Sequence, residues 1–168
     1  MRLWNRLYPS PTSLPEPPYW HGYDSLPAST GRNVKIQKTA KEMIVSPSLL
    51  SANFGNLQAD MDWLNRSSAD WLHIDIMDGV FVPNISFGFP VLKHVAKLCE
   101  KPLDVHLMIV QPEKFIPEVK ALGAYMMNVH YEACPHLHRV VGQIHEAGMK
   151  AGVTLNPATP VEVLRDII

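Results

Sequence analysis

The amino-acid sequence predicts an α/β fold, and within that class a (β/α)8 TIM barrel. From Met43 onward, short β-rich runs alternate with helix-like segments, which is the pattern of βαβ units in a parallel sheet. The runs begin about 22–32 residues apart, and each ends in a side chain capable of chemistry. Barrel enzymes collect their active-site groups in this way, because the carboxyl ends of the strands converge on one mouth.

The predicted elements follow the chain in strict alternation. Strands are expected over residues 43–50, 70–77, 102–110, 124–131 and 149–156, and helices over 55–68, 89–100, 112–122, 135–148 and 160–168. Thr159, Pro160 and Glu162 suit the N-cap, N1 and N3 positions of the last helix. Gly123 and Gly148 stand where the third and fourth helices need a left-handed C-terminal residue.

A doubly wound sheet has a similar spacing of elements and is the alternative architecture. No GxGxxG or P-loop pattern follows the first predicted strand, which weakens the nucleotide-binding alternative. The polar residues at the strand ends favour the barrel; in chain order they are Ser48, His73 with Asp75, His106, His130 and Asn156.

Residues 1–42 differ in composition from the rest of the chain. They hold six of the 15 prolines and show no strand or helix period, so we expect a disordered N-terminal extension. A partner-binding tail and an uninformative leader upstream of Met43 are the two interpretations of this segment. The predicted domain, part of a barrel, is residues 43–168.

Composition favours a small-molecule role. The chain has 168 residues, a net charge of -1 and scattered basic residues, and no apolar stretch approaches a membrane span. We therefore expect neither a nucleic-acid partner nor a membrane partner. Cys99 and Cys134 lack a CxxC spacing, so neither a disulfide framework nor a zinc ribbon is predicted, and a cytoplasmic protein with two thiols is expected.

The stretch "HIDIMDG" (residues 73–79) places charged groups in a hydrophobic strand. Side chains of a strand alternate between faces, so His73, Asp75 and Met77 share one face, which would point into the barrel. A buried carboxylate needs a partner. With His106 from the next strand, His73 and Asp75 form a ligand set suited to zinc, iron, manganese or cobalt; the alternatives are ordinary core histidines and an aspartate paired with a lysine.

The strings "SPSLLSANFGNL", "HIDIMDGVFVPNISFG", "DVHLMI", "VHYEA" and "AGVTLNPATP" closely resemble the ribulose-phosphate 3-epimerase family, from Met43 to Ile168. The resemblance implies a barrel of the ribulose-phosphate-binding type and a sugar-phosphate substrate. It implies metal ligation by His73, Asp75 and His106 and acid/base catalysis by Asp75. Substrate contacts are implied for Ser48, His106, Met77 and Met108. A homo-oligomer is expected for the full-length parent.

The implied reaction interconverts ribulose 5-phosphate and xylulose 5-phosphate by metal-assisted proton abstraction at C3, through an enediolate. The family's second acid is a late aspartate, and its phosphate loops follow later strands. The chain ends at Ile168, so we expect a barrel truncated after about five βα units and an inactive fragment. The alternatives are an epimerase for a hexulose phosphate such as allulose 6-phosphate, and a non-catalytic metal-binding fragment.

Overall fold

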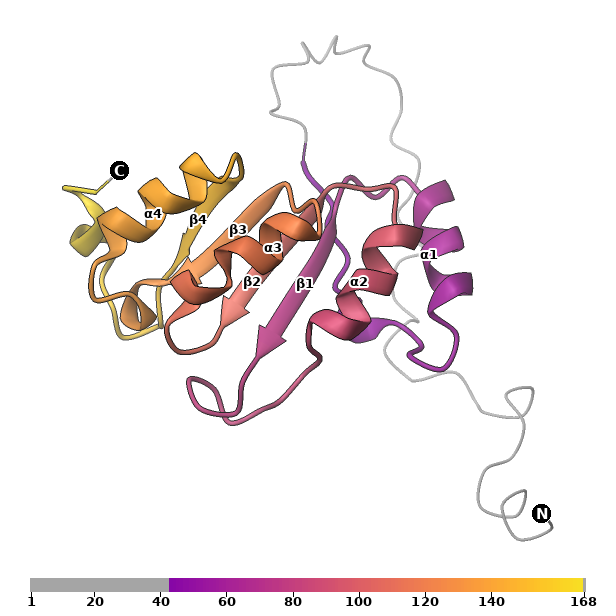
Figure 1. Cartoon of the computed structure of the whole chain (residues 1–168), viewed down its shortest axis with the longest axis horizontal. Coiled ribbons are helices and arrows are strands. Elements are labelled where there is room, and N and C mark those ends of the chain that lie inside the picture. Colours follow the sequence, from indigo (N-terminus) through magenta and orange to yellow (C-terminus); the bar gives the residue numbers. More distant parts are fainter. Residues whose placement is uncertain (1–42, 168) are drawn as a thin grey trace, which may run out of the picture. The chain divides into compact units, whose positions relative to one another are not determined.

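Four parallel strands, hydrogen-bonded in the order in which they follow the chain, form the sheet of this protein (Figure 1). The structure is a computed structural model that describes residues 43–167, so the predicted extension of residues 1–42 lies outside the described residues. The strands are β1 (Leu72–Met77), β2 (Leu103–Met108), β3 (Met126–His130) and β4 (Lys150–Thr154). A doubly wound sheet reverses its strand order, whereas this order runs in one direction, as in part of a TIM barrel.

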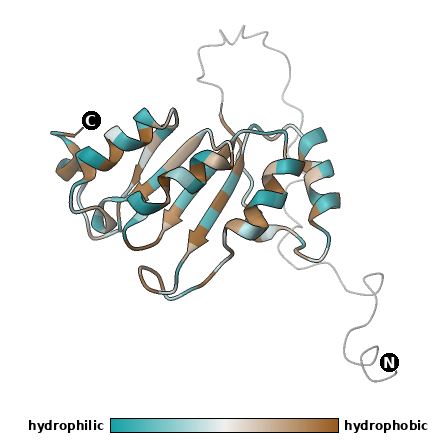
Figure 2. Cartoon of the chain, in the orientation of Figure 1, coloured by the Kyte–Doolittle hydropathy of each residue, from teal (hydrophilic) through white to brown (hydrophobic). Residues whose placement is uncertain are grey.

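The alternation predicted for the strand of "HIDIMDG" is confirmed. In β1 the side chains of Leu72, Ile74 and Ile76 are buried, while His73, Asp75 and Met77 between them are only partly buried. The same pattern repeats in β2, and Figure 2 shows it as alternating hydrophilic and hydrophobic bands along β1. One face of the sheet therefore carries the hydrophobic core, and the other carries the polar side chains.

Four helices supply the rest of that core. They are α1 (Leu57–Arg66), α2 (Phe89–Leu98), α3 (Ile116–Ala121) and α4 (Leu137–Glu146). Each directs apolar side chains into one cluster with the buried strand residues, among them Leu64, Leu92, Val119 and Ile144. Full burial of one such aliphatic side chain contributes about 1.5–3 kcal/mol. The packed helices hold the strands in register and so fix the positions of the polar side chains on the opposite face.

The prediction of a first strand over residues 43–50 is wrong. This segment runs beside β1, where the His73 N–H donates to the Pro47 carbonyl (2.9 Å), but only Ser48 forms a bridge, to His73. Pro47 has no N–H to contribute to a ladder. Directly after it, the Ser48 hydroxyl accepts from the Leu50 N–H and starts a 3-10 helix, η3 (Leu49–Ser51). The sheet of the described residues therefore has four strands where the sequence predicted five.

Two predicted helices also need correction. Residues 112–122 form a 3-10 turn, η4 (Pro112–Phe115), before α3, because Pro117 cannot donate the backbone hydrogen bond that a continuous helix needs there. The last predicted helix, residues 160–168, is a short 3-10 helix, η6 (Val161–Leu164), and Pro160 takes the cap position expected for Thr159. A further 3-10 turn, η5 (Tyr131–Ala133), follows β3.

The two predicted helix-ending glycines are confirmed. Gly123 follows α3 with φ +74° and Gly148 follows α4 with φ +82°, both in the left-handed region that disfavours a Cβ. These tight endings return the chain to β3 and β4. Among the helices of residues 43–167, none has the length and apolar character needed to cross a membrane.

Candidate metal centre

The polar face of the sheet is arranged in layers by the strand register. His73 of β1 is paired with Asp104 of β2, and one step toward the carboxyl ends, Asp75 is paired with His106. His106 is paired in turn with Asn128 of β3, and Asn128 with Gly152 of β4. A Cβ at Gly152 would come within 3.0 Å of the Asn128 side chain, so the glycine leaves room for the amide. Neighbouring strands thus place imidazole and carboxylate groups side by side.

Asp75 lies at the centre of this arrangement. One of its oxygens, Oδ1, is 3.0 Å from Nε2 of His73 and 3.2 Å from Nδ1 of His106. Its other oxygen accepts a hydrogen bond from the Ser48 hydroxyl at 3.1 Å. The Asp75 side chain is only 13% exposed. The sequence-predicted residues Ser48, His73, Asp75 and His106 are therefore brought together around one carboxylate.

The three predicted metal ligands have the geometry of a site that could hold a metal ion. His73, Asp75 and His106 each offer one ligand atom, and these atoms lie within 4.8 Å of one another. Two imidazole nitrogens and one carboxylate oxygen suit a divalent transition metal and leave coordination positions for other oxygen ligands. The donor set and its spacing fit such an ion.

The pKa values of His73, His106 and His130 are shifted in different directions because the surroundings of these residues differ. The hydrogen bond to Asp104 raises the pKa of His73 above its ordinary value. Burial, together with the neighbouring His130, lowers the pKa of His106. Burial also lowers the pKa of His130, although Glu132 acts in the opposite direction. His106 and His130 thus favour the neutral form, which leaves one ring nitrogen of each without a hydrogen.

The structure places three further groups beside the predicted ligands. Asp104 accepts from Nδ1 of His73 at 2.8 Å, and Nε2 of His130 lies 3.0 Å from Nε2 of His106. The rings of His106 and His130 stack with centroids 5.0 Å apart. Glu132, just after β3, approaches Nδ1 of His130 at 3.6 Å. The alternation of side chains along β2 places Asp104 and His106 on one face. Their contacts with His73 and His130 depend in addition on the register between strands, which the sequence does not reveal.

The two predicted methionines lie on the same face as the ligands but one layer further toward the carboxyl ends. Met77 and Met108 are register partners that end β1 and β2, and both are half-buried. Their thioether side chains are the apolar residues that follow Asp75 and His106 on this face of β1 and β2.

The loop after β1 is fixed by the Asp78 carboxylate. One carboxylate oxygen of Asp78 accepts from the N–H groups of Val80 and Phe81, and the other accepts from Val110 N–H after β2. The Phe81 ring packs on His130, with centroids 4.7 Å apart. Asp78 thereby joins two loops at the mouth and holds an aromatic ring against the His cluster.

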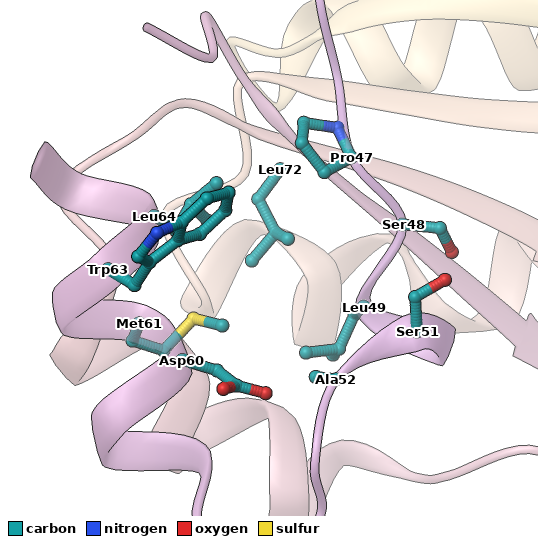
Figure 3. Close-up of a pocket in the computed structure, with 10 residues that line it drawn as sticks. All are labelled: Pro47, Ser48, Leu49, Ser51, Ala52, Asp60, Met61, Trp63, Leu64 and Leu72. Carbon is teal, nitrogen blue, oxygen red and sulfur yellow. The ribbon is translucent and has the colours of Figure 1, made fainter. Parts of the chain in front are cut away.

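A cavity of about 260 Å³ lies elsewhere, between α1 and the segment of residues 47–52 (Figure 3). Leu72, Met61 and Leu64 line it, and Leu72 belongs to the helix-covered face of β1, opposite to His73. The Asp60 carboxylate at its edge already accepts the Asn53 N–H at 2.6 Å. This cavity is part of the packing between η3 and α1 and is separate from the His and Asp cluster.

Comparisons with known proteins identify the family of the chain. Residues 44–168 match the sequence model of the ribulose-phosphate 3 epimerase family. The chain is 46% identical over 131 residues to a ribulose-phosphate 3-epimerase of Synechocystis sp., covering 77% of this chain and 57% of the relative. It is 49% identical over 123 residues to the Bacillus subtilis enzyme of the same name, covering 73% and 57%.

A ribulose-5-phosphate-3-epimerase of Arabidopsis thaliana, described as chloroplastic, is 46% identical over 129 residues, covering 76% of this chain and 46% of the relative. The chain spans about half the length of these curated relatives. The family match extends from the segment before β1 through η6, so it includes every residue of the candidate metal centre. The chain belongs to the ribulose-phosphate 3 epimerase family.

Proposed function

We propose that this chain supplies the metal-binding and proton-abstracting half of a ribulose-phosphate 3-epimerase site, for ribulose 5-phosphate and xylulose 5-phosphate. The observation that carries the proposal is the convergence of His73, Asp75 and His106 within 4.8 Å in a member of this family. Zinc, iron, manganese and cobalt are the ions that this donor set suits. We also propose that the protein is cytoplasmic. The relatives include two bacterial enzymes and one described as chloroplastic.

Epimerisation at C3 requires a base on one face of the sugar and an acid on the other. We assign the base to Asp75, whose carboxylate is held in place by His73, His106 and the Ser48 hydroxyl. When bound, the divalent ion would supply positive charge that stabilises the negative charge developing on the sugar oxygens. Ser48 and His106 are assigned to substrate binding, since both lie against Asp75.

Met77 and Met108 are assigned to the surroundings of the reacting carbon. Their half-buried side chains stand at the carboxyl ends of β1 and β2, on the ligand face. Apolar groups there would exclude water from the carbanion-like centre, which strengthens the electrostatic interactions that stabilise it.

The site formed by the described residues has one carboxylate in position to act as a base. Asp104 of the same face is engaged with Nδ1 of His73, and Asp78 is engaged by three backbone N–H groups. We therefore propose that a polypeptide limited to residues 1–168 does not epimerise its substrate. An assay of that polypeptide with added metal tests this part, and turnover would contradict it.

A chimera tests the proposed reaction itself. Residues 43–168 would be joined to the part of the Bacillus subtilis relative that lies beyond the matched segment, and formation of xylulose 5-phosphate would be measured by a coupled assay. We expect metal-dependent turnover, and a loss of about 10²–10⁴-fold in the Asp75→Asn variant, as for removal of a general base. A folded, metal-loaded chimera without turnover would contradict the assignment.

The same chimera separates the two candidate substrates. A pentulose epimerase should convert ribulose 5-phosphate with a higher kcat/KM than allulose 6-phosphate, because specificity is the ratio of these values. The reverse ratio would favour the hexulose-phosphate alternative. Zinc binding without turnover of either sugar would favour the non-catalytic metal-binding alternative.

A further inference from the structure

We propose that two sets of side chains fix the tautomers of the histidine ligands, Asp104 acting on His73, and His130 with Glu132 acting on His106. These three would be positioning residues that aim one bare ring nitrogen of each ligand at the ion. The inference rests on the proposed function, because it assumes that the cluster binds a divalent metal. It extends that function to residues outside the ligand set.

The first set follows from the chemistry of a carboxylate. Asp104 Oδ2 lies 2.8 Å from Nδ1 of His73, and an ionised carboxylate can only accept a hydrogen bond. The hydrogen of neutral His73 therefore belongs on Nδ1, which leaves the lone pair of Nε2 free. That nitrogen is the one 3.0 Å from Asp75 Oδ1, and so it faces the metal cluster. A carboxylate behind a histidine ligand sets the ring orientation in this way.

The second set follows from the contact between two imidazoles. His106 turns Nδ1 toward Asp75 (3.2 Å) and Nε2 toward Nε2 of His130 (3.0 Å). If Nδ1 of His106 binds the ion, its hydrogen must be on Nε2, and Nε2 of His130 must then accept it. The hydrogen of neutral His130 is consequently on Nδ1, which forms no hydrogen bond with the described residues and lies 3.6 Å from Oε2 of Glu132.

Glu132 is a carboxylate that approaches that N–H from just beyond direct hydrogen-bond distance. Its Oε2 is 3.6 Å from Nδ1 of His130, while its Oε1 accepts from the Asn156 N–H (2.8 Å) and from the Thr159 hydroxyl. These contacts tie the carboxylate to the chain after β4. Glu132, His130 and His106 thus follow one another from the end of β4 to the proposed ligands, with a direct contact between the two imidazoles and a longer, electrostatic approach of Glu132 to His130. His130 is 6% exposed, so water has little access to its contact with His106, whereas Glu132 lies at the solvent-exposed end.

The tautomers can be observed directly. Long-range ¹⁵N–¹H correlation spectra of the 168-residue chain loaded with zinc distinguish Nδ1–H from Nε2–H in each ring, with assignments from single His→Gln variants. We expect Nδ1–H for His73, Nε2–H for His106 and Nδ1–H for His130. The opposite tautomer in any of the three, or exchange between tautomers, would overturn the inference.

Zinc affinity, measured by calorimetry, gives a second and independent test. Asp104→Ala and His130→Phe should each weaken binding by about 10–100-fold, the usual effect of losing an outer partner of a metal ligand. Asp104→Asn keeps an oxygen acceptor and should recover much of the lost affinity, which a packing role alone would not predict. Asn128→Ala is the matched control, because Asn128 faces the same layer but bonds Thr154; its affinity should be unchanged.

Circular dichroism and thermal unfolding would establish that each variant is folded. Folded Asp104→Ala and His130→Phe variants that bind zinc as tightly as the parent chain would overturn the inference. Failure of the parent chain to bind zinc would overturn the proposed metal site together with it. Zinc binding with other tautomers would overturn the positioning roles alone, so the two failures are distinguishable.

Discussion

At the scale of single residues, Asp75 is the group around which the candidate metal centre is arranged. Its carboxylate contacts His73, His106 and Ser48, each from a different segment of the chain. A partly buried carboxylate needs hydrogen-bonding or charged partners. The contacts therefore favour a role for Asp75 in holding an ion as well as in proton transfer.

Replacing this carboxylate by an amide tests its part in ion binding. The Asp75→Asn side chain keeps its shape but loses its charge, so zinc affinity should fall by at least the roughly 10–100-fold that loss of an outer partner costs. Calorimetric titration measures the change. Asp62→Asn, which alters an exposed aspartate bonded to Gln58 on α1, is the control and should bind zinc like the parent chain. Unchanged affinity in Asp75→Asn would contradict the role.

Asp78 provides a pH-dependent test of the loop at the mouth. Burial raises the pKa of this carboxyl, but the hydrogen bonds from the backbone N–H groups of Val110, Val80 and Phe81 together outweigh burial and lower the pKa below the ordinary value. Its contribution to stability is therefore present above the ordinary aspartate pKa of about 3.9 and is lost as the pH falls through the folded-state pKa.

Asp78→Asn should accordingly lower the free energy of unfolding by about 1 kcal/mol at neutral pH, where hydrogen bonds to a charged acceptor are lost. The difference between variant and parent should disappear in acid. Urea unfolding at a series of pH values measures it. A difference that persists unchanged below the ordinary pKa would show that the carboxylate charge is not the cause.

At the scale of elements, helix endings decide where each strand begins. Gly123 ends α3 with φ +74°, and no atom lies within 4 Å of a Cβ placed there. Any effect of a side chain at this position must therefore come from the backbone conformation. Gly142 also has open space around a Cβ placed there, but it lies inside α4. Its backbone is therefore helical, and a side chain is not strained at this position.

The two glycines make a matched pair of substitutions. Gly123→Ala should destabilise the chain by about 1–2 kcal/mol, because an L-residue is strained in the left-handed region. Gly142→Ala should stabilise it by about 0.5–1 kcal/mol, because alanine loses less backbone entropy in a helix. Chemical denaturation of both variants tests the pair. Equal effects of the same sign would contradict the account of the helix ending.

Much of the element order, and the grouping of His73, Asp75 and His106, could be predicted from the sequence because both follow from local periodicity. Alternation in β1 assigns His73 and Asp75 to one face whatever the partners are. The pairing of His73 with Asp104 could not be predicted, since a shift of one residue in register between β1 and β2 would break it. The strand expected at residues 43–50 failed because Pro47 and the Ser48 cap act locally against a ladder.

At the scale of the whole molecule, β4 is an edge strand of the sheet formed by the described residues. β4 pairs with β3 alone, and an apolar groove of about 350 Å³ lies beside it, lined by residues that include Val141, Val153 and Leu164. Open strand edges beside apolar surface favour pairing with another chain. The 168-residue chain should therefore self-associate in solution.

Sedimentation velocity over a range of protein concentrations tests this expectation. Val153→Lys places a charge in the groove and should shift the chain toward the monomer, because an inward charge on an edge strand opposes pairing. Val80→Lys, on an exposed loop residue away from β4, is the control and should leave association unchanged. A monomeric parent chain at all concentrations would contradict the role of the edge.

The central claim is that His73, Asp75 and His106 together hold one divalent ion. The most direct measurement is anomalous diffraction at the zinc absorption edge from crystals of the zinc-loaded chain. The account predicts one strong peak bonded to Nε2 of His73, a carboxylate oxygen of Asp75 and Nδ1 of His106, at about 2.0–2.2 Å from each. A zinc-loaded crystal with no peak at this position, or with a peak bonded to other side chains, would contradict it.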